Sequence, residues 1–179
     1  AAFTQDGWLR TGDLAKMDEE GYVTITGRLK DIIITGSQNV IPGEVEDAIA
    51  QYPDIGEVAV VGIRDRAFFG DDAEFAELVD RFGEVVVAVV APVAGRSLVG
   101  QEDALIEFLK SPLAAYEVPK RVVVLNRLPY DGDLEKPDRR LLANLSWHAI
   151  VRAFGGDIDA AQADVAERLV AMQRVSPSA

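Results

Sequence analysis

Short apolar runs and amphipathic segments with helical spacing alternate along the chain. Residues 101–110 have apolar side chains at Leu105, Ile106 and Leu109, on one side of a helix. Three runs rich in β-branched residues have the length and composition of buried strands: Val58–Ile63, Val85–Val93 and Arg121–Leu125. The pattern therefore predicts two strands, a helix and a third strand between residues 58 and 125.

Two β-hairpins are expected before these strands. Trp8–Lys16 and Tyr22–Arg28 are strand-like and are separated by a turn-rich Asp-Glu-Glu-Gly segment. Asp31–Thr35 is followed by the Gly-Ser-Gln-Asn turn at 36–39, and the chain returns at Val40.

A helix should follow the second hairpin, starting at Pro42, because proline lacks the N–H that a first helical position leaves unpaired. Val45, Ala48 and Ile49 give this helix one apolar face. The elements together predict an α+β fold: a small sheet of about three strands flanked by helices, preceded by a β-hairpin and followed by a helical C-terminal extension.

Two segments are interpreted as additions to this plan. Residues 65–80 are acidic with a helical centre, and residues 144–179 are mostly helix-forming. Val165, Leu169 and Met172 form an apolar stripe in the second segment. We expect that stripe to pack against the domain, with oligomerisation or partner binding through the tail as the alternative.

Composition excludes several classes of protein. The net charge of −12 over 179 residues argues against nucleic-acid binding, which depends on Lys and Arg. The absence of cysteine excludes disulfides and thiolate metal sites and is compatible with a cytoplasmic location. No apolar run has membrane-spanning length. The single histidine, His148, has no nearby triad or metal partners, and no metal site is expected.

Two segments near the start carry the most specific signal. They read GWLRTGDL at 7–14 and GRLKDIIITGSQNVIPGEVEDAI at 27–49, and LAAYEVPKRV follows at 113–122. These segments resemble the crossover region and lid of the adenylate-forming enzymes: acyl-CoA synthetases, luciferases and peptide-synthetase adenylation domains. The resemblance covers most of residues 7–142. It implies that residues 1–29 end a large, absent N-terminal domain, that 30–143 form a mobile lid with an insertion at 65–80, and that 144–179 are an extension.

The resemblance assigns three residues to the junction. Asp13, in the TGDL motif, would hold the ribose of ATP and of the acyl-adenylate, since a carboxylate can accept hydrogen bonds from both hydroxyls. Arg28 would contact ribose or phosphate oxygens; alternatively it forms a surface ion pair. Lys30 matches the hinge position, where a few dihedral angles absorb a large rotation of the lid.

A thiol channel is implied at the second hairpin. Gly36, Ser37 and Asn39 match a turn past which a pantetheine arm runs, although many acyl-CoA synthetases have GGEN where this chain has GSQN. Phe82 matches an aromatic residue that borders the channel. An ordinary hairpin turn and a core phenylalanine are the alternatives.

Lys136 is the catalytic candidate. In the family the lysine of the closing loop bridges the carboxylate and the α-phosphate during adenylation. Lys136, Asp138 and Arg139 follow this pattern, whereas Glu135 replaces the usual glycine and the loop is one residue longer. Without the resemblance this segment would be interpreted as a solvated basic cluster.

The implied parent is an ATP-dependent acid–CoA ligase acting on a fatty or aryl acid, with AMP as a product and Mg²⁺ held by the missing domain. The isolated chain is expected to be inactive. Two alternatives remain: the acyl group is passed to a carrier protein, or the lid is catalytically degenerate and acts as a binding module, as Glu135 beside Lys136 suggests.

Overall fold

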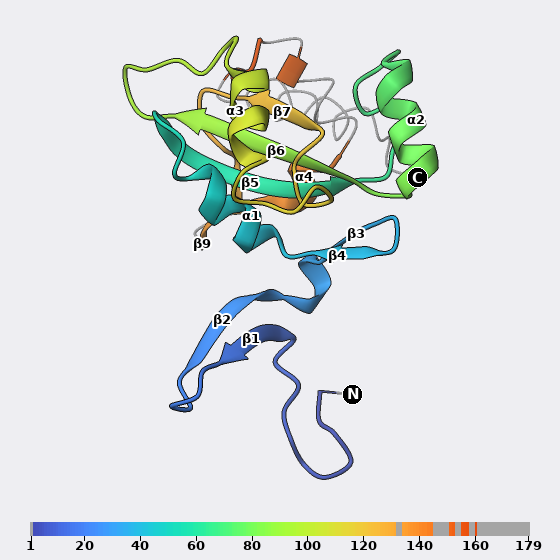
Figure 1. The fold of residues 1–179 in the computed structure, drawn as a ribbon, viewed down its shortest axis with the longest axis vertical. Helices are drawn as coiled ribbons and strands as arrows, with labels where there is room; N and C mark the ends of the chain where they lie inside the picture. Colours follow the sequence, from blue (N-terminus) through green and yellow to red (C-terminus); the bar gives the residue numbers. More distant parts are fainter. Residues whose placement is uncertain (1, 132–133, 145–150, 153–154, 158–159, 161–179) are drawn as a thin grey trace, which may run out of the picture.

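The computed structural model describes residues 2–131, 134–144, 151–152, 155–157 and 160. Its centre is a three-stranded sheet in the order β5–β6–β7 (Figure 1). Strand β5 (Ile55–Ile63) pairs antiparallel with β6 (Val85–Pro92), and β6 pairs parallel with β7 (Arg121–Val124). The three predicted strands and the α+β class are confirmed.

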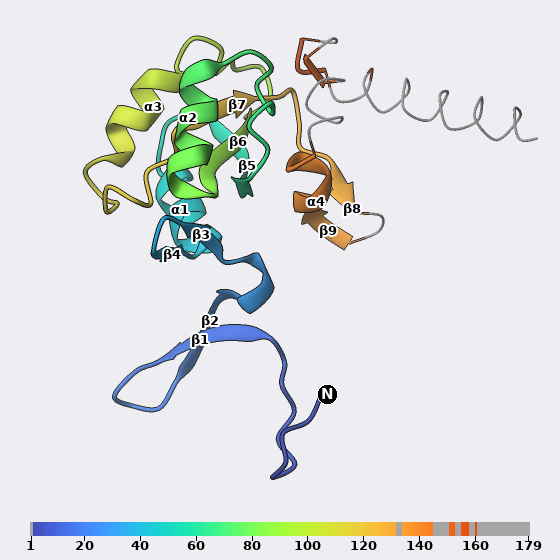
Figure 2. The same cartoon turned by 90° about the vertical axis from the view of Figure 1, so that its right-hand side faces the viewer.

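Both faces of this sheet are buried, which explains why its strands are apolar without alternation. Helices α1 (Pro42–Ile49) and α3 (Glu102–Leu109) cover one face, where they pack on Val60, Val86 and other residues of the same parity. Helices α2 (Ala73–Phe82) and α4 (Arg139–Leu142) pack on the other face, against Val61, Val87 and their neighbours (Figure 2).

Residues 73–80 of helix α2 form half of the predicted acidic insertion at 65–80. The helix begins at Asp72, whose carboxylate accepts the Phe75 amide at 2.9 Å, and it ends at Gly83, whose φ is +76°. Phe75 and Val79 are buried in the core. The segment thus supplies apolar side chains to the core as well as an acidic surface.

The two predicted hairpins are present, with one change. Strand β1 (Asp13–Met17) pairs with β2 (Val23–Arg28), and after the 3₁₀ turn η1 (Leu29–Asp31), β3 (Ile33–Thr35) pairs with β4 (Gln38–Val40). The first strand was expected to begin at Trp8. It begins at Asp13, directly after Gly12, whose φ of +79° interrupts an extended strand.

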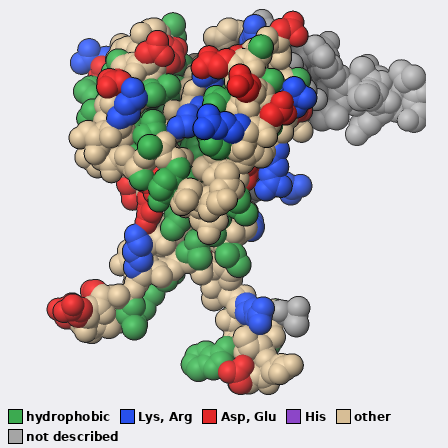
Figure 3. All heavy atoms as spheres, turned by 45° about the vertical axis from the view of Figure 1, so that its right-hand side comes forward, with side chains coloured by type: hydrophobic (Ala, Val, Ile, Leu, Met, Phe, Trp, Pro, Cys, Tyr) green, Lys and Arg blue, Asp and Glu red, His purple; other side chains and the backbone are tan. Residues whose placement is uncertain are grey.

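The N-terminal hairpin projects from the rest of the molecule (Figures 1 and 3). Large apolar side chains are exposed on residues 1–29, among them Trp8 at 74% and Tyr22 at 74%. An exposed apolar surface of this kind is typical of an interface.

The segment around Lys136 was predicted to be a loop, and this prediction is wrong. Strands β8 (Tyr130–Asp131) and β9 (Leu134–Pro137) form a small antiparallel hairpin there, followed by α4. His148 and the apolar stripe of Val165, Leu169 and Met172 in the predicted helical tail lie outside the described residues. Of the helices in the described ranges, none has the length and apolar character needed to span a membrane.

Replacing Phe75 tests whether the 65–80 segment is integral to the fold. Phe75 is fully buried and its ring packs edge-to-face on Phe69 with centroids 4.7 Å apart. We expect Phe75→Ala to lower the free energy of unfolding by about 3–5 kcal/mol, because it leaves a cavity. Denaturant unfolding of the chain measures this.

The matched control is Glu77→Ala, on the exposed side of the same helix, with an expected change within about 0.5 kcal/mol. Equal effects of the two substitutions would show that α2 contributes nothing to the core.

Candidate functional site

Asp13 and Arg28 are cross-strand neighbours at the open end of the β1–β2 hairpin. The Arg28 Nε lies 3.3 Å from Asp13 Oδ1, and the two side chains are 54% and 29% exposed. The Thr11 hydroxyl accepts the Asp13 amide at 3.1 Å, and the Leu29 amide donates to the Gly12 carbonyl at 2.8 Å. The geometry therefore presents a carboxylate and a guanidinium side by side on the surface, which suits contacts with hydroxyl or phosphate oxygens.

Lys30 lies in η1, the single turn that connects this hairpin to the body of the molecule. A shallow cavity of about 210 Å³ lies beside it. Its lining includes the charged side chains of Lys30 in η1, Arg64 directly after β5, Glu84 directly before β6, and Arg139 and Arg140 in α4. A larger cavity of about 640 Å³, lined by Phe69 and Arg152 among others, contains none of the predicted site residues.

The described contacts between the N-terminal hairpin and the rest of the molecule involve small residues or exposed side chains. A Cβ on Gly27 would lie 3.1 Å from a methyl carbon of Ile41, and one on Gly43 would lie 3.0 Å from the Thr26 carbonyl oxygen. Both glycines thus allow close approach. Lys16 on β1 also pairs with Glu44 on α1, and this hydrogen bond raises the pKa of the Lys16 ammonium. Separating Lys16 from Glu44 costs little, since exposed ion pairs contribute little to stability.

The structure brings together two of the predicted channel residues, Gly36 and Phe82. The Gly36 amide donates to the Phe82 carbonyl at 2.7 Å, and a Cβ on Gly36 would lie 3.4 Å from the Phe82 ring. Gly36 has a φ of +60°, which favours glycine. Only Gly36 and Ser37 form the turn, whereas Asn39 belongs to β4 and pairs with Ile34. Ser37 and Asn39 are exposed.

A nearly buried carboxylate holds this hairpin against the sheet. Glu84, at the start of β6, is 8% exposed and accepts the Ile34 amide at 2.8 Å. Arg64 lies 3.4 Å from the same carboxylate, and its own side chain is largely exposed. The position of the Gly36 turn is therefore fixed from both sides, by Phe82 and by Glu84.

Lys136 is exposed on β9, and the two motif residues that follow it have structural contacts. Asp138 accepts the Leu141 amide at 2.9 Å and so caps α4. Arg139 pairs with Glu46 of α1 at 2.6 Å and donates to the Val60 carbonyl at 2.5 Å. Among the described residues, no hydrogen bond or ion pair joins Lys136 to Asp13 or Arg28.

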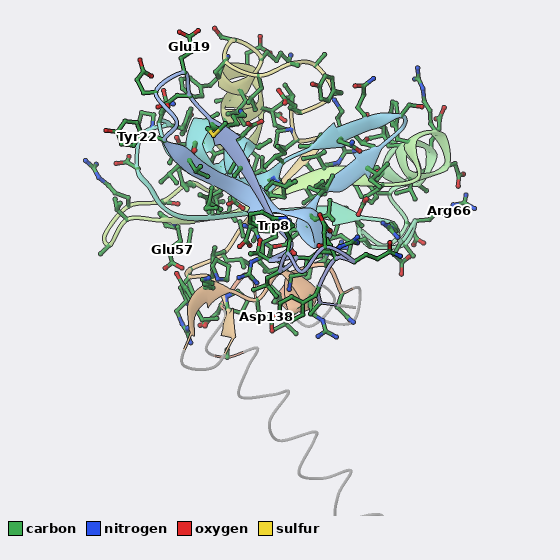
Figure 4. The ribbon with its side chains drawn as sticks, turned by 90° about the horizontal axis from the view of Figure 1, so that it is seen from below. Trp8, Glu19, Tyr22, Glu57, Arg66 and Asp138 are labelled. Carbon is green, nitrogen blue, oxygen red and sulfur yellow. The ribbon has the colours of Figure 1, made fainter. Side chains whose placement is uncertain are left out.

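Sequence reasoning missed the structural roles of Glu46 and Glu57. The Glu46 carboxylate accepts the Val60 amide at 2.7 Å. Glu57 accepts both the Leu128 amide and the Tyr130 hydroxyl at 2.9 Å, next to the orange β8–β9 hairpin (Figure 4). No local sequence pattern predicts these contacts. The partners of Glu57, for example, are more than 70 positions away in the chain.

Comparison with curated proteins gives many relatives, although no model of a known protein family matches the chain. An indoleacetate–CoA ligase of Aromatoleum aromaticum is 42% identical over 144 residues, which are 79% of this chain and 25% of the relative. The medium/long-chain-fatty-acid–CoA ligase FadD8 of Mycobacterium tuberculosis is 38% identical over 159 residues, or 84% of this chain and 25% of the relative. The chain thus spans about a quarter of the length of these relatives.

Solved structures give the same result. ATP-bound MatB from Rhodopseudomonas palustris has a TM-score of 0.65 and 36% identity, covering 79% of this chain and 25% of that one. The o-succinylbenzoate CoA synthetase MenE of Bacillus subtilis, in complex with its acyl-adenylate intermediate, has a TM-score of 0.63 and 31% identity over 80% of this chain and 26% of that one. The chain therefore belongs to the adenylate-forming superfamily of acyl-CoA ligases, and it fits a C-terminal fragment of such an enzyme.

Proposed function

We propose that residues 30–143 form the mobile lid of an ATP-dependent acid–CoA ligase and that residues 1–29 belong to its large nucleotide-binding domain. The observation that carries the proposal is the placement of two segments with candidate site residues on the body formed by the β5–β6–β7 sheet and its helices. The β3–β4 turn with Gly36 and the β8–β9 hairpin with Lys136 lie on different sides of that body in both ribbon views (Figures 1 and 2). A single turn at Lys30 connects the body to the Asp13–Arg28 pair.

Such an arrangement suits two consecutive reactions at one nucleotide site. In the first, a carboxylate oxygen attacks the α-phosphorus of ATP; an O–P bond forms and pyrophosphate leaves. The exposed ammonium of Lys136 would stabilise the charge shared by the carboxylate and the α-phosphate, while Asp13 accepts the ribose hydroxyls. Rotation at Lys30 would then withdraw Lys136 from the site.

In the second reaction, the thiol of CoA attacks the acyl carbon. A C–S bond forms, the acyl–phosphate C–O bond breaks, AMP leaves and the thiol proton passes to solvent. The Gly36 turn is held by Phe82 and Glu84, and it is the edge that would line the thiol path. Because Gly36 has no Cβ, the pantetheine arm could pass close to its backbone.

The substrate class is inferred from the relatives. The relatives include an indoleacetate–CoA ligase, a medium/long-chain-fatty-acid–CoA ligase and a feruloyl-CoA synthase, which supports a fatty or aryl acid for the parent of this chain. Mg²⁺ would accompany ATP. No group of three or more potential ligands able to hold a metal ion occurs in the described part of the chain, so no Mg²⁺ ligand is assigned to it.

The exposed apolar side chains of residues 1–29 support the assignment of that segment to a larger domain. Trp8, Tyr22, Val23 and Ile25 are each more than 60% exposed. Burial of such groups against the large domain would be favourable by about 1.5–3 kcal/mol for each full-sized side chain.

The first test is Lys136→Ala in the full-length parent. We expect adenylate formation, followed as acid-dependent exchange of pyrophosphate into ATP, to fall about 10²–10³-fold, since a charge-stabilising donor is lost. Thioester formation from added acyl-adenylate should change by less than about threefold. The matched control is Lys110→Ala, an exposed lysine directly after α3. Unchanged pyrophosphate exchange in Lys136→Ala would refute the catalytic role and favour a degenerate lid.

The second test is Lys30→Pro, compared with Lys30→Ala. Proline fixes φ and so restricts rotation at this residue. We expect Lys30→Pro to separate the two half-reactions, one staying near the wild-type rate and the other falling by at least about tenfold. Lys30→Ala keeps the rotation and should leave both rates within about threefold. If both rates respond equally to proline and to alanine, Lys30 is not the pivot.

The acceptor is tested separately with preformed acyl-adenylate. CoA and a phosphopantetheinylated carrier protein are offered to the full-length enzyme, and the thioester formed on each is measured. We expect CoA to be used at least about tenfold faster, because the relatives that match over this region are CoA ligases. The reverse preference would favour the carrier-protein alternative.

A further inference from the structure

The segment that carries Lys136 is attached to the sheet at its beginning by one carboxylate. The Oε2 atom of Glu57 accepts the Leu128 amide and the Tyr130 hydroxyl, each at 2.9 Å. Glu57 follows a register irregularity in β5, and a Cβ on Gly56 would lie only 2.8 Å from the Pro92 carbonyl oxygen. A bulge of this kind changes the direction in which the next side chain points.

A second carboxylate attaches the other end of the segment. Glu46 of α1 receives Arg139 Nη1 on Oε1 at 2.6 Å and Arg139 Nη2 on Oε2 at 2.9 Å. Glu46 and Arg139 also bond the amide and the carbonyl of Val60, respectively, at 2.7 and 2.5 Å. Their side chains are only 17% and 29% exposed, so this two-point pair is shielded from most of the solvent.

Between these two attachments, the two ends of the β8–β9 hairpin are hydrogen-bonded to each other. Tyr130 pairs with Pro137 in the β8–β9 register, and the Asp138 amide donates to the Pro129 carbonyl at 2.8 Å. Lys136 immediately precedes this closed end and is exposed. Its Cα is therefore fixed relative to the sheet, although its own side chain is free to reach outward.

We propose that Glu57, with Tyr130, and Glu46, with Arg139, are positioning residues that place Lys136 for adenylate formation. The proposal rests on the function proposed above. A lysine side chain is long and flexible, so the direction of its ammonium depends on where its backbone is held. A displacement of about 1 Å in a reacting group can reduce a rate by about 10²-fold.

The experiment uses the full-length enzyme with Glu57→Ala, Glu57→Gln and Tyr130→Phe. We expect Glu57→Ala to slow pyrophosphate exchange about tenfold while thioester formation from added acyl-adenylate changes by less than about twofold. Glu57→Gln keeps a carbonyl oxygen as acceptor and should restore most of the rate. Tyr130→Phe removes one hydrogen bond and should slow exchange about threefold. Glu107→Ala, an exposed glutamate on α3, is the control for loss of a carboxylate.

A double-mutant cycle with Lys136→Ala distinguishes positioning from general structural support. If Glu57 acts through Lys136, adding Glu57→Ala to Lys136→Ala should slow pyrophosphate exchange by no more than about twofold further. A full additional tenfold loss, or equal losses in both half-reactions, would overturn the proposal. Should Glu57→Ala fail to fold, Tyr130→Phe, with its expected threefold loss, provides the same cycle.

The two proposals fail in different ways. If Lys136→Ala itself leaves pyrophosphate exchange unchanged, the proposed function is wrong, and the positioning role is wrong with it. If Lys136→Ala is defective but Glu57→Ala and Tyr130→Phe have wild-type exchange rates, only the positioning role is refuted.

Discussion

Burial of both faces of a three-stranded sheet is the constraint on which the rest of this structure depends. Helices α1 and α3 cover one face, and α2 and α4 cover the other. With neither face open to solvent, groups that meet a ligand have to lie at the edges or beyond the strand ends. The Gly36 turn, the Lys136 hairpin and the Lys30 turn all lie there (Figures 1 and 2).

Three glutamates, namely Glu46, Glu57 and Glu84, connect the Gly36 turn and the Lys136 hairpin to the rest of the fold. Each accepts one backbone amide; the donors are Val60, Leu128 and Ile34, respectively. A charged acceptor makes such a bond stronger than a neutral one, with a net contribution of about 1.5–3 kcal/mol. Moving the Gly36 turn or the Lys136 hairpin away would leave a shielded carboxylate without its hydrogen-bond partners, which costs free energy. This cost holds the two segments in place.

The junction at Lys30 has the opposite character. The N-terminal hairpin contacts α1 through glycines, and one exposed ion pair, Lys16–Glu44, crosses the gap. Contacts of this kind form and break at small cost. The function proposed above requires weak contacts here, since a rotation at Lys30 would have to break them.

Local sequence determined a large part of this protein. Continuous apolar runs predicted β5, β6 and β7, because strands that are buried on both faces do not alternate. Helical apolar spacing predicted α1 and α3, because each helix buries one face. Pro42 and Gly36 indicated a helix start and a turn, and short motifs made Asp13, Lys30 and Lys136 the candidate site residues. Tertiary structure alone decided that the Lys136 segment is a hairpin and that Glu46 and Glu57 hold it. Those contacts join positions 93 and 73 residues apart, and nothing in a short window of sequence encodes which distant groups a carboxylate will meet once the sheet and its helices have packed.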